Sequence, residues 1–413
     1  MSKPMGPIPA GFGADEDGML LIGGCRAGAL VDEAGDTPLF VYDLAMVEQR
    51  ITRFRSAFAG VDLHFAMKAN PYPPVLRHII KLVDGIDLAS GGEMMTALEA
   101  GADPERMSFA GPGKREPELE AAVGAGVTLN CESEGEVDRA LAAGRRLGVT
   151  PRLAVRVNPD FEIKGSGMRM GGGARPFGVD AERVPALVRH IVASGARWRG
   201  FHIFAGSQAL SHEALIEAQR ASVALAAELA DAAGATPPLV NLGGGFGIPY
   251  VHGDAELGIE PIGQALATEL AQRPPILAES RFAIELGRWL VGQCGVYLTR
   301  IVDRKISHGK TFLITDGGMH HQLAASGNFG QVIRRNYPVA IADRYGAEPQ
   351  EEVTIVGCLC TPLDRLADDV MMPRAETGDL VAVFLAGAYG LSASPQAFLS
   401  QHPAREMTVG GGD

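Results

Sequence analysis

One lysine ends a short apolar segment in a way that suits covalent chemistry. Lys68 follows His64–Met67 and precedes the turn-forming residues Ala-Asn-Pro-Tyr-Pro. At the carboxyl end of a strand in a parallel β/α fold, its amine would point to the face where such folds carry their active sites. A partly desolvated amine has a lowered pKa and can attack a carbonyl to form a Schiff base. A lysine that only extends its amine from a strand end into solvent is the alternative.

A glycine-rich segment suits the binding of a phosphate group. Residues 241–250 read Asn-Leu-Gly-Gly-Gly-Phe-Gly-Ile-Pro-Tyr and overlap the end of an apolar run. Three adjacent glycines allow backbone N–H groups to approach a phosphate without a Cβ in the way. A tight turn that binds nothing would use the same glycines, so this alternative stays open.

A carboxylate and a guanidinium lie three residues apart at the end of another apolar run, as Glu285 and Arg288 of the segment Phe282–Arg288. The carboxylate can hold a protonated ring nitrogen and the arginine can bind a phosphate; a simple ion pair is the alternative. Together the three segments require a ligand with an aldehyde, a phosphate and a basic ring nitrogen. Pyridoxal 5′-phosphate (PLP) has all three groups, so we expect it as the cofactor.

The elements that must position these residues alternate between residues 61 and 290. Short apolar runs predict strands at Leu63–Met67, Gly85–Ala89, Met107–Ala110, Val127–Asn130, Arg152–Val157, Gly200–Phe204, Leu239–Leu242 and Phe282–Leu286. Helical spacing of apolar residues predicts helices at Gly91–Ala100, Arg115–Ala125, Glu134–Leu147 and Glu213–Ala233. Such alternation indicates parallel βαβ units. Eight strands in roughly 230 residues fit a (β/α)8 TIM barrel, which takes about 250; an open doubly wound sheet is the alternative.

The pattern changes after residue 290, where little helix is expected. Strands separated by turn residues are predicted at Gly295–Ile306, Thr311–Thr315, Glu352–Cys360 and Asp379–Phe384, and near the N-terminus at Leu20–Ile22 and Pro38–Val41. We therefore expect residues 1–45 and 291–413 to form one β domain, a β-barrel or β-sandwich. The PLP-binding barrel is expected to comprise residues 46–290.

Composition excludes several classes of protein. The 413 residues include 37 basic and 49 acidic ones, for a net charge of −12, which argues against a nucleic-acid partner. No apolar run reaches the roughly 18 residues that a spanning helix needs, and the first residues lack a signal-peptide pattern. We expect a cytoplasmic protein without a membrane partner. Five scattered cysteines do not form a disulfide framework.

These motifs resemble those of a known family, the fold-type III PLP-dependent decarboxylases, which include ornithine and diaminopimelate decarboxylases. The resemblance runs from Thr37 to about Leu399. It is greatest to the exosortase-A-system-associated pyridoxal-dependent decarboxylases, which share stretches like Phe109–Lys114, Val157–Asp160, His202–Gln208 and Ala324–Gly330. The resemblance implies an alanine-racemase-like barrel, a C-terminal β domain, and a homodimer with shared active sites.

The resemblance also implies roles for individual residues. Lys68 would bind PLP as a Schiff base, and Glu285 would pair with the pyridine nitrogen. His202 would stack on the ring, while Arg156 and Glu93 would orient polar groups around it. The residues expected to hold the phosphate are Ser207, Gly244, Gly245, Arg288 and Tyr389.

The reaction that the resemblance implies is decarboxylation of an amino acid. A carboxylate at position 285 keeps the pyridine nitrogen protonated, which favours loss of CO2, whereas alanine racemases place an arginine there. Cys360 of the partner subunit would then protonate Cα, and Asp364 falls on the family's Cys-x-x-x-Asp pattern. An amino-acid racemase and a non-catalytic PLP-binding protein are the alternatives.

We expect no metal. Cys358 and Cys360 share one face of the predicted strand and could bind zinc, but no second cysteine pair or spaced histidine motif follows. His320 and His321 are adjacent, and neighbours on a strand point to opposite faces. A turn or a substrate contact explains them better than a metal site.

The residues around the substrate leave its identity open. In ornithine and diaminopimelate decarboxylases an acid after the catalytic cysteine meets the distal ammonium, but here the residue is Thr361. The absence of an acidic side chain at this position argues against a simple diamino acid as the substrate. Arg334 and Arg335 stand near the arginine that diaminopimelate decarboxylase uses for a distal carboxylate. An acidic or acyl-linked amino acid, which a carrier could hold, is therefore an alternative. Tyr337 and Asp364 are the other candidates for substrate contact.

Overall fold

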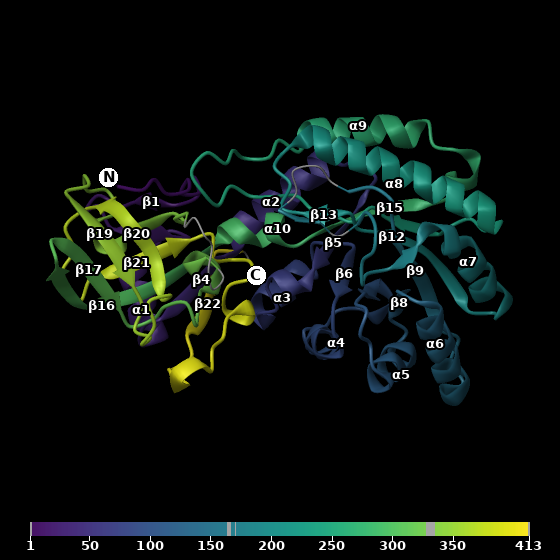
Figure 1. Ribbon diagram of the computed structural model, residues 1–413, viewed down its shortest axis with the longest axis horizontal. Coiled ribbons are helices and arrows are strands. Elements are labelled where there is room, and N and C mark those ends of the chain that lie inside the picture. Colours follow the sequence, from purple (N-terminus) through teal and green to yellow (C-terminus); the bar gives the residue numbers. More distant parts are fainter. Residues whose placement is uncertain (1, 163–166, 170, 328–334, 412–413) are drawn as a thin grey trace. The chain divides into compact units, whose positions relative to one another are not determined.

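The chain folds into two compact units. The computed structural model describes residues 2–162, 167–169, 171–327 and 335–411. The barrel unit comprises Arg50–Gly247 and Leu257–Gly287, and the β unit comprises Met1–Gln49, Ile248–Glu256 and Arg288–Asp413. The helices and strands of both units are labelled in Figure 1.

The barrel unit is built on a closed parallel sheet. The eight strands that close the barrel are β5 (Asp62–Ala66), β6 (Gly85–Leu88), β7 (Met107–Phe109), β8 (Thr128–Cys131), β9 (Arg152–Asn158), β12 (Arg197–Ile203), β14 (Leu239–Asn241) and β15 (Arg281–Leu286), and the short strand β11 (Val179–Asp180) also pairs with β9. They pair in the order β9-β12-β14-β15-β5-β6-β7-β8, and β8 pairs with β9 to complete the circle. Every predicted barrel strand is present at nearly the expected position. The barrel is confirmed, and closure excludes the open doubly wound sheet.

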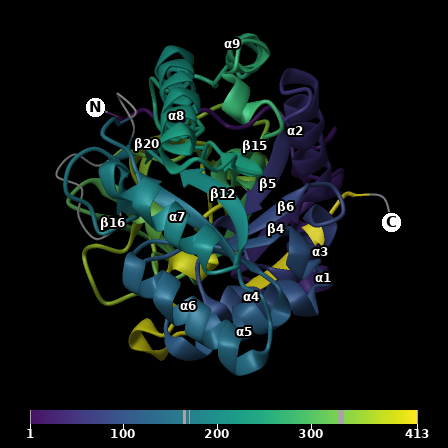
Figure 2. The same cartoon turned by 90° about the vertical axis from the view of Figure 1, so that its right-hand side faces the viewer.

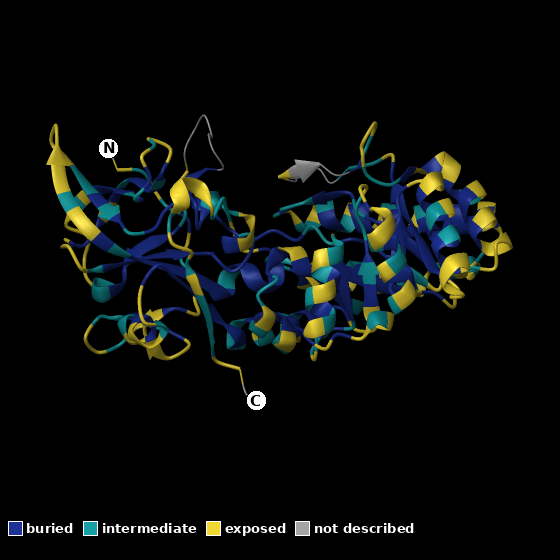
Figure 3. Ribbon diagram, turned by 90° about the horizontal axis from the view of Figure 1, so that it is seen from below, coloured by how far each residue is buried: buried dark blue, intermediate teal, exposed yellow. Residues whose placement is uncertain are grey.

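Helices surround these strands in the end-on view of Figure 2. They are α3 (Pro73–Ile79), α4 (Gly91–Glu99), α5 (Glu116–Ala125), α6 (Glu134–Leu147), α7 (Val184–Ala193), α8 (His212–Ala233) and α9 (Glu260–Ala271). Helix α6 shows why they begin and end there: Ser133 accepts a hydrogen bond from the N–H of Glu136, and Gly148 ends the helix at φ 66°. Figure 3 shows buried strands and helices exposed on their outer faces.

The β unit carries a mixed sheet to which both ends of the chain contribute. Its strands are β16 (Gly295–Ser307), β17 (Lys310–Thr315), β18 (Val339–Ile341), β19 (Glu351–Val356), β20 (Arg365–Met372) and β21 (Leu380–Phe384). From the N-terminal part, β4 (Leu39–Asp43) pairs with β16, and the late strand β22 (Arg405–Val409) pairs with β4. The prediction that N-terminal strands join the C-terminal β domain is confirmed.

Smaller elements complete the β unit. A three-stranded sheet contains β1 (Gly13–Ala14), β2 (Leu20–Ile22) and β3 (Cys25–Arg26). Further helices are α1 (Ala27–Ala34), α2 (Leu44–Ala57), which continues into the barrel unit, and α10 (Arg288–Val291). Within the described residues, no helix is both long and apolar enough to cross a membrane.

One predicted strand is too long. The prediction placed Cys358 and Cys360 on one face of a strand, but β19 ends at Val356 and the chain then turns. A Cβ at Gly357 would lie 2.2 Å from a carboxylate oxygen of Asp364, so the chain there packs around a buried acid instead of continuing the sheet. Cys358 is half-buried and Cys360 is exposed.

Candidate active site

A pocket of about 300 Å³ opens at the carboxyl ends of the barrel strands. Lys68, Arg156, His202 and Glu285 line it, so the barrel unit brings these four predicted residues together. Further lining residues are Ala66, Asp87, Leu88, Ala89, Ala110, Gly111, Pro112 and Phe177. The pocket lies at the end of the barrel that carries active sites in this fold.

Lys68 lines this pocket, and among the described residues its amine forms no hydrogen bond or ion pair. It follows β5 within a short 3-10 turn, Met67–Ala69, and its side chain is exposed although both neighbours are buried. Its Nζ lies 5.6 Å from the centre of the Phe204 ring. The turn thus directs the lysine out of the barrel wall, where an aldehyde can reach it.

Glu285 is a buried carboxylate that stays ionised. Its Oε2 lies 2.9 Å from Nε2 of His202, and Nδ2 of Asn241 donates to the same oxygen over 3.3 Å. Burial by itself raises the pKa of Glu285, but the charge of His202 and its hydrogen bond outweigh burial and hold the pKa below its ordinary value. A carboxylate held ionised in this way can pair with a protonated ring nitrogen.

Arg156 is fixed by an acid that the sequence analysis missed. Its Nη1 donates to Oε1 of Glu132 over 2.8 Å, and its guanidinium lies 5.0 Å from the centre of the Phe177 ring. Glu132 also accepts the N–H groups of Gly111 (2.5 Å) and Gly178 (3.0 Å). Glu132 therefore anchors one side of the pocket. Its position directly after strand β8, at the end that carries active sites, was the available signal.

Glu93 lies in the first turn of α4, the helix that follows β6. Ser90 caps α4 by accepting the N–H of Glu93, and Oε2 of Glu93 accepts the N–H of Ala89 over 2.6 Å. Burial raises the pKa of Glu93, while the Ala89 N–H and the charge of Lys68 oppose the rise. Ala89 is a wall of the pocket, so Glu93 fixes the backbone at its edge.

The glycine-rich loop offers a cradle without side chains. A Cβ at Gly244 would lie 1.8 Å from the backbone oxygen of Glu285, and Gly245 has a φ of 84°. Within the described part of the chain, the N–H groups of Gly244 and Gly245 have no backbone or side-chain acceptor. Ser207 is half-buried on the short strand β13 (Gly206–Ser207). Free N–H groups beside the strand ends suit a phosphate, so these residues fit PLP.

In the β unit, Arg288 and Tyr389 lie together with a tyrosine that the sequence analysis missed. The Arg288 guanidinium lies 4.7 Å from the centre of the Tyr389 ring and donates to the hydroxyl of Tyr250 over 2.8 Å. Tyr337 packs against Tyr250 with ring centres 4.9 Å apart. Burial raises the pKa of Tyr250, so its hydroxyl stays protonated. Tyr250 is the last residue of the glycine-rich segment, but its spacing along the sequence gave no sign that it contacts Arg288.

The segment with Cys360 is organised by Asp364. The Asp364 carboxylate accepts the N–H groups of Met319 (2.7 Å) and Leu359 (2.8 Å) and is buried. Cys360 is exposed, and Thr361 follows it in the same turn. Asp364 thereby shapes the turn, and its predicted contact with substrate stays a prediction. Arg334 lies outside the described residues, and Arg335 is exposed.

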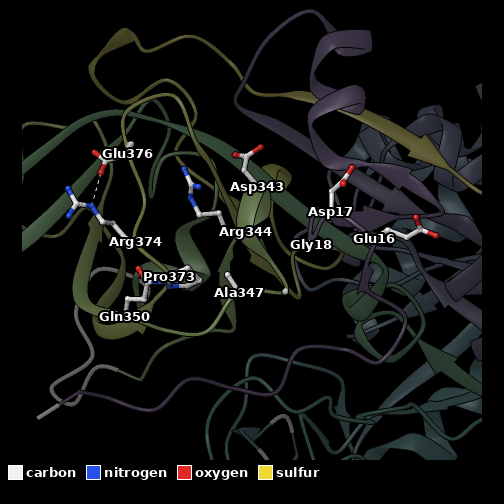
Figure 4. Close-up of a pocket in the computed structure, with 11 residues that line it drawn as sticks. Glu16, Asp17, Gly18, Asp343, Arg344, Ala347, Gln350, Pro373, Arg374 and Glu376 are labelled. Atoms are coloured by element: carbon white, nitrogen blue, oxygen red, sulfur yellow. Dashed lines mark hydrogen bonds and ion pairs between the residues drawn. The ribbon is translucent and has the colours of Figure 1, made fainter.

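A second cavity, in the β unit, offers different surroundings. It has a volume of about 650 Å³, and the predicted site residues do not line it (Figure 4). Its arginines are already engaged: Arg374 pairs with Glu376 over 2.8 Å, and Arg344 pairs with Asp379 over 2.9 Å. The chemistry expected from the sequence therefore belongs to the barrel pocket.

Comparison with known proteins decides the family. The family model described as "Pyridoxal-dependent decarboxylase, pyridoxal binding domain" matches residues 44–292. The chain belongs to this family of pyridoxal-dependent decarboxylases. It is therefore a PLP-dependent carboxy-lyase that acts on an amino acid, and the fold, cofactor and reaction class expected from the sequence are confirmed. These findings favour decarboxylation over racemisation and over binding without catalysis.

Individual relatives cover nearly the whole chain. An L-glutamyl-[BtrI acyl-carrier protein] decarboxylase of Niallia circulans is 36% identical over 375 residues, which are 89% of this chain and 87% of that protein. A diaminopimelate decarboxylase of Methanothermobacter thermautotrophicus is 31% identical over 405 residues, 95% of this chain and 91% of that protein. The crystal structure of Helicobacter pylori diaminopimelate decarboxylase complexed with L-lysine has a TM-score of 0.81 at 26% identity and covers 92% of this chain and 94% of that one.

Proposed function

We propose that this decarboxylase acts on an acidic amino acid whose distal carboxyl group is joined to a carrier. In this proposal the enzyme is a homodimer, and Cys360 of the partner subunit completes each site. The likeness to the glutamyl carrier-protein decarboxylase, 36% over 89% of this chain, is the observation that carries the proposal. The five cysteines are all free, which supports a cytoplasmic location.

The residue after Cys360 supports this substrate class. Thr361 replaces the acid that meets the distal ammonium of a diamino acid in the related enzymes. The Thr361 hydroxyl accepts the N–H of Leu363 over 3.4 Å within the turn, so it serves the local backbone. Without a carboxylate here, a distal ammonium would be poorly paired, whereas an acylated side chain brings no such charge.

In this proposal different residues of the chain have different roles around the cofactor. PLP, when bound, takes up the electron pair released as CO2 leaves the substrate. Lys68 would hold the cofactor, and Gly244 and Gly245 would bind its phosphate through backbone N–H groups. Glu285, kept ionised by His202, would hold a proton on the pyridine nitrogen. The Cys360 thiol of the partner subunit would then donate a proton to Cα.

Diaminopimelate is the second candidate substrate. The 31% identity to a diaminopimelate decarboxylase over 95% of this chain favours it. Arg334 and Arg335 are the residues expected to meet its distal carboxylate. In this reading the distal ammonium would need a partner other than Thr361.

Release of CO2 from a panel of substrates separates these candidates. The panel contains glutamate as a phosphopantetheine thioester, free glutamate, diaminopimelate and ornithine, each with the purified holoenzyme. We expect kcat/KM for the thioester to exceed that for every free amino acid by at least about tenfold, a difference of about 1.4 kcal/mol. Faster turnover of free diaminopimelate would contradict the carrier-linked substrate and support the second candidate.

A further inference from the structure

A separate cavity of about 250 Å³ lies at the amino ends of the barrel strands. It is lined by the first residues of β5 and β15, Asp62 and Arg281, and by Arg199 of β12. Ser108 and Thr128 contribute polar walls. From the amino ends the cavity reaches into the barrel as far as His64 and Asn241, whereas Lys68 does not line it. The proposed reaction requires no ligand in this cavity.

The carboxylates around this cavity are already neutralised. Asp62 accepts from Arg281 over 2.7 Å, and Asp84 pairs with Arg55. Glu105 pairs with Arg152, whose Nη1 lies 3.1 Å from the carboxylate. Each of these three lining acids is therefore in an ion pair with an arginine other than Arg199.

Among the described residues, two arginines that line the cavity form no ion pair with a carboxylate. One is Arg106, which donates to the backbone oxygens of Val83 and Asp84, and the other is Arg199. Arg199 lines the cavity and is half-buried, and within the described residues its guanidinium has no hydrogen bond or ion pair. Burial lowers the pKa of Arg199, and the positive charges of Arg152 and Arg197 lower it further, while the charge of Glu105 opposes the shift. A partly desolvated guanidinium without a hydrogen-bonded partner is costly unless an anion is present.

We propose that this cavity binds a phosphate-type oxyanion, with Arg199 as its principal ligand. The planar guanidinium can donate two parallel hydrogen bonds to such an anion. An occupant would bridge the amino ends of strands that are far apart in sequence. Because it would bind only the folded barrel, it would stabilise the protein against unfolding.

Titration calorimetry with holoenzyme tests this site. PLP is kept at full occupancy, checked by its absorbance, so that the cofactor's own phosphate site is filled. Inorganic phosphate and glycerol 3-phosphate are titrated separately at constant ionic strength into wild type, Arg199→Gln and Arg197→Gln. Arg197 is a matched control because it is exposed on the same strand, β12, and does not line the cavity. Arg199→Met replaces Arg199→Gln if the latter does not fold.

We expect saturable binding of one anion per chain in wild type. Arg199→Gln should weaken it by about tenfold or more, as for loss of a charge-assisted contact, and Arg197→Gln by less than about threefold. Tighter binding of glycerol 3-phosphate points to a phosphorylated metabolite, and tighter binding of inorganic phosphate points to the free ion. Absence of saturable binding, equal losses in both variants, or unchanged binding in Arg199→Gln would overturn the proposal.

Discussion

Nε2 of His202 lies 2.9 Å from Oε2 of Glu285, and both side chains are buried in the barrel. This contact holds the Glu285 carboxylate ionised where burial alone would favour its protonated form. Asn241 contacts the same carboxylate oxygen, and its Oδ1 accepts the N–H of Gly243 over 2.8 Å. Asn241 therefore links two parts of the site through hydrogen bonds: Glu285, which we expect to pair with the ring nitrogen, and the glycine-rich loop, which we expect to bind the phosphate.

Replacing Glu285 with Gln should slow decarboxylation without preventing PLP binding. The amide keeps the shape of the side chain but removes the charge that keeps the ring nitrogen protonated. We expect kcat to fall about a hundredfold or more, as for the loss of one preorganised electrostatic partner. Steady-state rates and PLP absorbance check both parts. Glu228→Gln, an exposed glutamate on α8, is the control. An unchanged kcat in Glu285→Gln would mean that another group holds the ring nitrogen.

Glu132→Gln should loosen the cofactor pocket. The substitution removes the charge that Arg156 contacts and disturbs the acceptors of the Gly111 and Gly178 N–H groups. We expect the PLP dissociation constant to rise about tenfold and the free energy of unfolding to fall by about 1–3 kcal/mol. Fluorescence titration with PLP and denaturant unfolding measure the two effects. Wild-type PLP affinity in the variant would show that Arg156 needs no anchor.

His320 should make the folded protein sensitive to mild acid. Burial lowers the pKa of its imidazole to about 4, from an ordinary value of 6.5. The unfolded chain therefore binds a proton more readily, so stability is full above pH 6.5 and declines as the pH falls toward 4. A tenfold difference in proton affinity between the folded and unfolded states corresponds to about 1.4 kcal/mol. His320→Gln should flatten this decline in urea unfolding measured from pH 7 to pH 4; equal slopes for both proteins would contradict the assignment.

Mixed dimers test whether each site takes residues from two chains. Homodimers of Lys68→Ala or Cys360→Ala should be inactive or strongly impaired at both of their sites. Random exchange makes half of the dimers mixed, and each mixed dimer has one intact site, so activity should recover to about a quarter of wild type. Mixing Lys68→Ala with Glu285→Gln is the control, because both residues lie in the same barrel unit and should not complement. No recovery after proven exchange would place Cys360 within its own chain's site.

Much of the barrel was predictable because its strands are short, apolar and separated by helices with clear periodicity. The carboxyl ends of those strands fixed where Lys68 and Glu285 would lie. The β unit was harder: β20 contains Asp368 and Asp369 within a strand, and its register with β19 shifts twice, so no simple alternation marks it. The prediction of a strand through Cys360 was wrong because the chain turns there around the buried side chain of Asp364. Asp364 accepts the N–H of Met319, which is 45 residues away in sequence, so no local pattern marks this turn.

The missed site residues share a physical cause. Glu132, Asn241 and Tyr250 act through contacts with residues distant in sequence: Arg156, Glu285 and Arg288. A single polar residue after a strand carries no periodic signal, so its partner is visible only once the barrel has closed. Spacing along the chain predicted the candidate catalytic and cofactor-binding residues, but it did not predict the residues that position them through hydrogen bonds.

The most direct test of the account is to find which lysine carries PLP. Borohydride reduction of the purified holoenzyme should abolish the visible absorbance of the bound cofactor, and peptide mass spectrometry should find a pyridoxyl group on Lys68. Two other lysines are internal controls: Lys81 is exposed, and Lys114 is buried and pairs with Glu136 over 2.6 Å. We expect a single adduct on Lys68, absent from Lys68→Ala. An adduct on Lys81 or Lys114, or none on Lys68, would contradict it.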